Sequence, residues 1–293
     1  MSDMNQERVA AAASVGGACS VQVGAALGAT VFPLIGPAGV VALRQAVAAT
    51  ALLAIARPNP RRLTFRAIRP AVLLGLALVV MNWALYGAVE RLGLGLAVTL
   101  EFLGPLTLAL VGSRRRLDLG AAALAGTGVV LLTGTVPGID LTGVALGLLA
   151  AGAWAAYIVL NQRVGARLPG VQGTAVASLV AAVLTAPLLV FALAGLDPRV
   201  LGHVLLIGLA AGILSSALPY SIDLNVLRVL PRNIFGVLQS VQPAAAALAG
   251  FVVLGQALSA WQLTGLALIS VGNVVAVGRP ARGAGPAEAA ASA

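Results

Sequence analysis

One acidic residue, Glu101, stands near the middle of the apolar run LGLGLAVTLEFLGPLTLALVG, which covers residues 92–112. A charged side chain at the centre of a membrane-spanning helix costs about 2.5–3.5 kcal/mol on insertion scales, and such residues commonly serve a solute or proton path. Pro105 follows four residues later. Because proline has no N–H, the Glu101 carbonyl loses its helical partner and the helix should kink. A carboxylate and a free carbonyl at one point predict a site for a cation, an ammonium group or water.

Arg44 is the one arginine inside a predicted span, and its charge is opposite to that of Glu101. The plainer interpretation is a buried ion pair that only holds helices together. In the functional interpretation, Glu101 lies in the path of a solute or proton, because acidic residues inside a membrane-spanning helix are usually functional. The two interpretations are compatible, because a buried pair can also open and close a path.

A second polar stripe runs along the segment at 200–227. Four of its residues recur at helical spacing and share one helix face: Ser216, Pro219, Tyr220 and Asp223. Pro219 should also free the Ser215 carbonyl. For Asp223, an interfacial position near the cytoplasmic end of the helix fits the pattern as well as a place in the path does.

Other polar and aromatic side chains inside predicted spans are candidates for the same path. They are Asn82 and Tyr86 in the third span and Trp154, Tyr157 and Asn161 in the sixth, with Gln22, Gln239 and Gln242 as weaker candidates. Pro243 follows Gln239 by four residues, as Pro105 follows Glu101. Each residue alone is more typical of helix packing than of a site, so a site requires that they converge on one cavity.

The elements that must position these side chains follow from composition. Hydrophobic residues make up 60% of the 293 residues, charged residues only 9%, and the mean hydropathy is +1.01. Soluble domains carry about 25% charged residues, so this composition predicts a multi-pass membrane protein. Ten apolar stretches have the length of a membrane-spanning helix. They cover residues 9–31, 37–56, 68–89, 92–113, 117–134, 141–162, 170–194, 200–227, 232–255 and 258–278.

The arginines predict the orientation of these spans. All 18 basic residues are arginine, and most of them fall between alternate spans. These are Arg8, Arg57, Arg61, Arg62, Arg66, Arg69, Arg114, Arg115, Arg116, Arg163, Arg167, Arg228, Arg232, Arg279 and Arg282. The opposite side receives only Arg91 and Arg199. The positive-inside rule therefore predicts that both termini are cytoplasmic, and arginines placed this way do not indicate nucleic-acid binding.

The two halves of the chain resemble each other weakly. A shift of 138 residues places Glu101 on Gln239 and Pro105 on Pro243. Five spans per half is an odd number, so the halves would have opposite orientations, as in many secondary transporters. The expected divisions are a first repeat at 1–134, a second repeat at 141–278 and a disordered cytoplasmic tail at 279–293. Two stretches that merely share composition are the alternative.

Three pairs of glycines have the spacing of close helix contacts in membranes. They are Gly24/Gly28, Gly143/Gly147 and Gly208/Gly212. The chain has no metal-ligand spacing, phosphate loop, catalytic triad or nucleotide-binding fingerprint. We therefore expect neither an enzyme nor a bound metal or cofactor.

Two long segments carry a family resemblance. They are NWALYGAVERLGLGLAVTLEFLGPLTLALVGSRR (82–115) and SSALPYSIDLNVLRVLPRNIFGVLQSVQPAAAALAGFVVLGQALSAWQ (215–262). They resemble the EamA branch of the drug/metabolite transporter superfamily, most closely the threonine/homoserine exporters of bacterial inner membranes. The resemblance implies an inverted-repeat carrier of ten helices that exports small metabolites, with amino acids favoured. Two departures concern the second half, where Gln242 and Gln256 replace acids that are usual in the family.

The function expected from these observations is secondary transport by alternating access, coupled to protons through Glu101. Its partners are a small-molecule substrate and the lipid bilayer of the inner membrane, and a homodimer is left open. One alternative is a drug or other metabolite carrier of the same superfamily. Another, from a different class, is a membrane assembly or signalling subunit that transports nothing, which would have a dry, apolar interior. An intramembrane enzyme is the least favoured.

Overall fold

The computed structural model describes residues 2–58, 65–110, 116–134, 138–165, 167–219, 221–222, 226 and 237–277. Every regular element among these residues is a helix. In chain order they are α1 (Ser2–Ala29), α2 (Phe32–Ala56), α3 (Phe65–Leu92), α4 (Leu94–Glu101), α5 (Leu103–Leu110), α6 (Arg116–Gly134), α7 (Leu141–Gly165), α8 (Gln172–Leu193), α9 (Pro198–Gly212), the π-helical η2 (Ile213–Ala217), α12 (Gln242–Leu254) and α13 (Ala260–Val277). Tyr220, Asp223 and the predicted tail at 279–293 lie outside the described residues.

Helix length and composition support the membrane assignment. Seven helices of the described chain are long and apolar enough to cross a bilayer, and three shorter apolar helices cover Leu94–Leu108, Gly120–Leu132 and Ala260–Ala276. Large apolar side chains also face outward, among them Phe191, which is 79% exposed, and Val252, which is 70% exposed. Because such side chains favour lipid over water, the fold is that of an all-helical, multi-pass membrane protein. The count of ten spans stays a prediction.

Two of the predicted spans are interrupted near their middle. The predicted span at 92–113 divides into α4 and α5, with the break at Phe102. In the second half, helix at 237–239 is followed by a turn at Ser240 and Val241 before α12 begins. Both helices after the break carry a proline near their start, where a missing N–H removes no helical hydrogen bond. The interruptions therefore follow from Pro105 and Pro243 and occur 138 residues apart.

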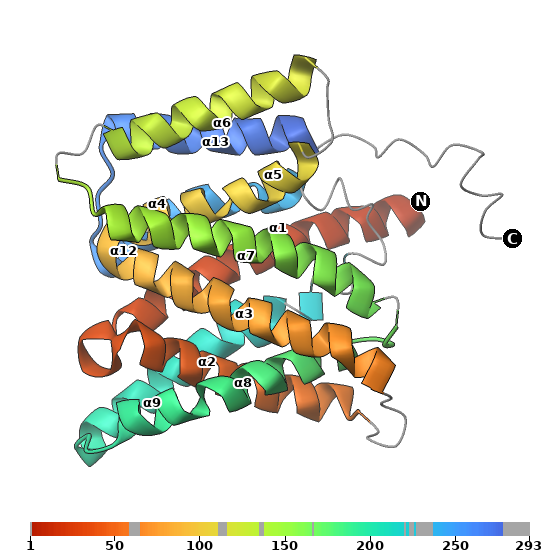
Figure 1. Ribbon diagram of the computed structural model, residues 1–293, viewed down its shortest axis with the longest axis vertical. Coiled ribbons are helices and arrows are strands. Elements are labelled where there is room, and N and C mark those ends of the chain that lie inside the picture. Colours follow the sequence, from red (N-terminus) through yellow and green to blue (C-terminus); the bar gives the residue numbers. More distant parts are fainter. Residues whose placement is uncertain are drawn as a thin grey trace, which may run out of the picture.

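The helices lie nearly side by side across the molecule, as Figure 1 shows, with α6 along α13 at one edge and α2 along α8 toward the other. The α6–α13 contact is close and reciprocal. A methyl group on Gly128 would lie 2.7 Å from the Gly265 carbonyl oxygen, and one on Gly265 would lie 2.6 Å from the Gly128 carbonyl oxygen. Backbones can approach this closely only because neither residue has a side chain.

Replacing Gly128 with leucine should destabilise the protein by about 1–3 kcal/mol, because the new side chain has no room between the two backbones. Gly126, two residues earlier on the same helix, has no atom within 4 Å of a new methyl group and is exposed. Gly126→Leu is therefore the matched control, with little expected effect. Thermal unfolding of both variants in detergent measures the difference, and equal melting temperatures would contradict this contact.

The start of α2 differs from the predicted span at 37–56. The helix begins at Phe32, and Gly36 interrupts it with φ 66° and ψ 165° before Pro37. Residues with positive φ of this kind are nearly always glycine, since a Cβ would clash with the backbone. The short turn Phe32–Ile35 is thus joined to the rest of α2 through a single non-helical residue.

Candidate functional site

Arg44 of α2 lies at the centre of a buried polar cluster. Its guanidinium sits 4.8 Å above the ring centroid of Tyr86 on α3, a cation–π contact. Its Nη2 donates to the Ser216 hydroxyl at 3.2 Å and to the Ser215 carbonyl at 3.4 Å. We call Arg44, Tyr86, Ser215, Ser216 and Glu101 the central cluster.

Ser215 and Ser216 belong to the π-helical segment η2. In η2 the Leu218 N–H bonds back to the Ile213 carbonyl, five residues earlier. Pro219 has no N–H to offer the Ser215 carbonyl, so this acceptor is available to Arg44. Single turns of π-helix are frequent at functional sites because they reorient a backbone or a side chain within a helix. Here η2 presents a carbonyl and a hydroxyl to the same cation.

Glu101 is the last residue of α4 and is 7% exposed, while Arg44 is 6% exposed. The two opposite charges attract each other electrostatically. Within the described residues, however, no hydrogen bond or ion pair joins their side chains. The interpretation that Glu101 only pairs with Arg44 therefore does not describe this conformation. The helix break at Phe102 leaves the carboxylate at the end of a short helix, next to the edge-on contact of Phe102 with Trp154 on α7 (centroids 4.7 Å apart).

The cluster has unused hydrogen-bonding capacity. The Nε of Arg44 is buried and has no hydrogen-bond partner among the residues that the structure describes. The carboxylate of Glu101 accepts no hydrogen bond from any residue that the structure describes. An unpaired buried polar group costs about 1–3 kcal/mol, so such groups usually serve a ligand, water or another conformation. A guanidinium and a carboxylate that attract but do not bond can each take one end of a zwitterion.

The predicted glycine pairs hold these helices together around the central cluster. A methyl group on Gly24 of α1 would lie 2.8 Å from the Ser215 nitrogen, and one on Gly28 would lie 3.4 Å from the Tyr86 hydroxyl. On α9, Gly212 lies against Val47. On α7, a methyl group on Gly147 would lie 2.9 Å from Leu100. Small residues at these positions allow the close packing that brings the charged side chains within reach of one another.

Two predicted site residues, Asn82 and Tyr157, form hydrogen bonds within their own helices. The Asn82 side chain is buried and donates to the Leu78 carbonyl of its own helix at 2.8 Å. Tyr157 accepts a hydrogen bond from Asn161 at 3.2 Å and packs against an apolar core between α3, α7 and α8. These contacts are those of helix packing. Tyr220 and Asp223, two further predicted site residues, lie outside the described residues.

Two glutamines form a separate polar contact. Gln22 of α1 donates to Gln242 of α12 at 2.9 Å, and both side chains are buried. Gln242 stands where the family resemblance implied an acid, and as an amide it can accept this bond without a buried charge. Gln239 lies half-buried one turn earlier along the chain. The pair ties the two halves of the chain together beside the second helix break.

The hydrogen bonds of Arg44 were not predicted, although Ser216 was a candidate residue. The Ser215 carbonyl followed from Pro219, but the π-helical register that adds the Ser216 hydroxyl has no recognisable sequence signal. The position of Tyr86 beneath the guanidinium was also not foreseen, although Tyr86 was itself a candidate. Phe32, whose ring lies 5.6 Å from that of Tyr86, carried no polar signal at all.

The chain has clear relatives. A profile of the EamA-like transporter family matches residues 141–278. The threonine/homoserine exporter RhtA of Salmonella typhimurium (strain LT2) is 39% identical over 266 residues, which cover 89% of each chain. The protein of the same name from Escherichia coli (strain K12) is 40% identical over 264 residues, 88% of each chain. A protein of known crystal structure shares the fold, with a TM-score of 0.62 at 22% identity, and covers 92% of this chain and 97% of its own.

Proposed function

We propose that this chain, which belongs to the EamA-like transporter family, exports threonine, homoserine or a closely similar small amino acid across the inner membrane. The observation that carries the proposal is the similarity to the threonine/homoserine exporters, about 40% identity over nearly the full length of both chains. Identity this extensive includes the spans on which the cluster side chains stand. The buried, oppositely charged cluster supports a zwitterionic cargo on chemical grounds that are independent of the relatives.

In the proposed binding mode, the ammonium group of the amino acid meets Glu101 and its carboxylate meets the guanidinium of Arg44. The Nε of Arg44 supports this mode, since it is a buried donor that no atom of the described residues uses. Tyr86 and Ser216 hold the guanidinium in place from two sides. A fixed planar cation is well suited to a carboxylate, because a guanidinium can donate two parallel hydrogen bonds to it.

Glu101 also supplies the proposed coupling to protons. A carboxylate cannot hold a proton and serve as the counter-charge of an ammonium group at the same time. Competition between the two therefore links release of the amino acid on one side of the membrane to uptake of a proton there. Return of the carrier then moves the proton inward, which drives export.

The proposed architecture is ten spans in two inverted repeats, 1–134 and 141–278, that rock about the central cluster. The helix interruptions at Phe102 and at Ser240, which are 138 residues apart, support it. So does the reciprocal contact of Gly128 with Gly265, which is expected where paired helices meet near a two-fold axis. The family match over 141–278 spans the second of the proposed repeats.

The proposed orientation places both termini in the cytoplasm, following the arginine distribution. The end of the molecule where α1 joins α2, α3 joins α4 and α12 joins α13 is then the outer end. Arg91 lies there in an ion pair with Asp140, at 2.7 Å. Arg57 and Arg163 lie at the C-terminal ends of α2 and α7, which the proposed orientation places on the cytoplasmic side.

Efflux from proteoliposomes tests the proposed cargo. Purified protein is reconstituted, the liposomes are loaded with labelled threonine, and efflux is followed with and without a pH gradient. We expect efflux above that of protein-free liposomes, competition by homoserine and none by lysine, whose second ammonium group has no counter-charge in the cluster. Efflux equal to that of protein-free liposomes would overturn the proposed cargo.

A further inference from the structure

A cavity of about 340 Å³ lies at the proposed outer end of the molecule. Its wall combines apolar side chains with one carboxylate and one carboxamide. The lining includes Phe32, Val89, Glu90, Leu254 and Gln256. The elements that meet there are the turn between α1 and α2, the end of α3 and the end of α12.

Phe32 stands between the cavity and the central cluster. Its ring lines the cavity on one side. On the other side it packs at a tilt of 58° on Tyr86, with ring centroids 5.6 Å apart. Tyr86, in turn, is 1% exposed and lies directly beneath the guanidinium of Arg44. Phe32 therefore contacts both the outer cavity and Tyr86 of the central cluster.

The segment that carries Phe32 has a hinge built into it. Phe32–Ile35 forms a single turn, closed by hydrogen bonds of the Leu34 and Ile35 N–H groups to the Val31 carbonyl. Gly36 then leaves the helical conformation, and Pro37 cannot bond back to the turn. A methyl group on Gly36 would meet no atom within 4 Å, so the surroundings leave space for this joint.

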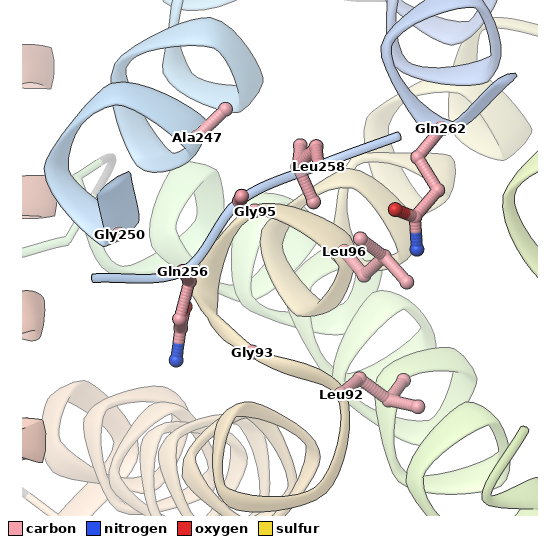
Figure 2. A pocket seen from close by; sticks show the side chains of 10 residues that line it. Leu92, Gly93, Gly95, Leu96, Ala247, Gly250, Gln256, Leu258 and Gln262 are labelled. Carbon is pink, nitrogen blue, oxygen red and sulfur yellow. The ribbon is translucent and has the colours of Figure 1, made fainter. Parts of the chain in front are cut away.

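The opposite wall of the cavity is fixed. The Gln256 side chain accepts a hydrogen bond from the Leu94 N–H at 2.9 Å, which holds the α12–α13 connection against the start of α4. Figure 2 shows this connection crossing over Gly95, with the Gln256 side chain directed toward the turn at Gly93. A smaller cavity of about 260 Å³ lies along the same contact. Movement that opens the path is therefore easier on the Phe32 side.

We propose that the outer cavity is a release chamber for the exported amino acid, and that Phe32, on the turn hinged at Gly36, is the gate between this chamber and the central cluster. The proposal rests on the proposed function. When the turn swings outward, the ammonium group of the amino acid passes from Glu101 to Glu90, the carboxylate of the chamber. When the turn closes, the ring of Phe32 again covers Tyr86.

Cysteine accessibility tests the gate. Cys19, the only cysteine of the chain, is first replaced by serine. Val40 lies one helical turn before Arg44 on α2 and is fully buried, so Val40→Cys reports on the cluster side of the gate. Val89→Cys reports on the chamber side. In right-side-out vesicles, an impermeant thiol reagent should label Val40→Cys slowly, and at least about tenfold faster once Phe32→Ala is added.

Leu34→Ala is the matched control, because Leu34 belongs to the same turn but is 42% exposed and is not among the residues that line the cavity. It should leave labelling of Val40→Cys unchanged, and labelling of Val89→Cys should be the same in all variants that fold. If Phe32→Ala does not fold, Phe32→Leu replaces it, with a smaller increase expected. An unchanged labelling rate in a folded Phe32 variant would overturn the gate.

The same vesicles separate the gate from the proposed cargo. If labelling responds to Phe32→Ala but the unmodified chain moves no threonine, the gate stands and threonine is not the cargo. If threonine is exported but labelling does not respond, the cargo stands and the gate is elsewhere. Gly36→Ala gives a further check, because its methyl group has room but its backbone conformation is strained. It should also raise labelling of Val40→Cys.

Discussion

Threonine efflux should fall by about 30-fold or more when Glu101 is replaced by glutamine, since removing one member of a desolvated charge pair costs about 2–5 kcal/mol and each 1.4 kcal/mol is about tenfold. The amide keeps the shape of the side chain but cannot balance the ammonium group of the cargo. The remaining efflux should also lose its dependence on the pH gradient, because glutamine takes up no proton. Initial rates of efflux at several imposed gradients measure both effects.

Folding should not limit this experiment. A neutral amide is less costly to bury than a carboxylate, so Glu101→Gln should be at least as stable as the unmodified chain. Asp140→Asn is the matched control. It makes the same chemical change at a half-exposed residue whose partners are Arg91 and the Gly143 N–H, away from the central cluster. Full, gradient-dependent efflux in a folded Glu101→Gln variant would remove the carboxylate from the mechanism.

Replacing Arg44 with lysine should raise the threonine concentration at half-maximal transport by about tenfold, or about 1.4 kcal/mol in binding. Lysine keeps the positive charge, but an ammonium group is a point donor and cannot present the planar fork of a guanidinium. It would also lose the stacking on Tyr86 and could not reach Ser216 and the cargo together. Counterflow at increasing threonine concentrations measures the shift.

Arg57→Lys makes the same substitution on the same helix and serves as the control. Arg57 is exposed at the end of α2, where its side chain donates only to the Ala54 carbonyl within its own helix. Its replacement should leave the half-saturating concentration unchanged. If Arg44→Lys and Arg57→Lys behave alike, the guanidinium of Arg44 does not hold the carboxylate of the cargo.

The separation of the two charges in the central cluster matters for ligand binding. A buried ion pair that is fully formed has no need of a ligand, whereas two attracting but unbonded groups leave part of their desolvation cost uncompensated. A zwitterion placed between them supplies both missing partners. Within the described chain, the bonds of Arg44 run to η2 rather than to Glu101, and this geometry keeps the guanidinium and the carboxylate available.

The membrane setting and the candidate charges were readable from the sequence. An apolar run of membrane-spanning length forces a helix, because backbone groups in lipid must pair within their own segment. A charge such as Glu101 is costly inside such a run, so its presence there indicates a functional role. The prolines gave further local information. Pro105 and Pro243 lie at the two observed helix breaks, and Pro219 freed the carbonyl that Arg44 now uses.

Residues with a local signal, such as a charge or a proline inside an apolar run, could thus be predicted from the sequence. Residues whose role depends on their neighbours in space could not. Asn82 and Tyr157 were candidates because of their polarity, yet Asn82 donates to the Leu78 carbonyl and Tyr157 accepts from Asn161, each within its own helix. Phe32 reads as one more apolar residue, and only the approach of α2 to α3 sets its ring between a cavity and Tyr86. Hydropathy and helical periodicity are properties of one segment, so the sequence alone predicted which segments are apolar enough to cross a membrane and which charges they carry. Distances between helices depend on how all of them pack, so only the tertiary structure decided which side chains contact Arg44.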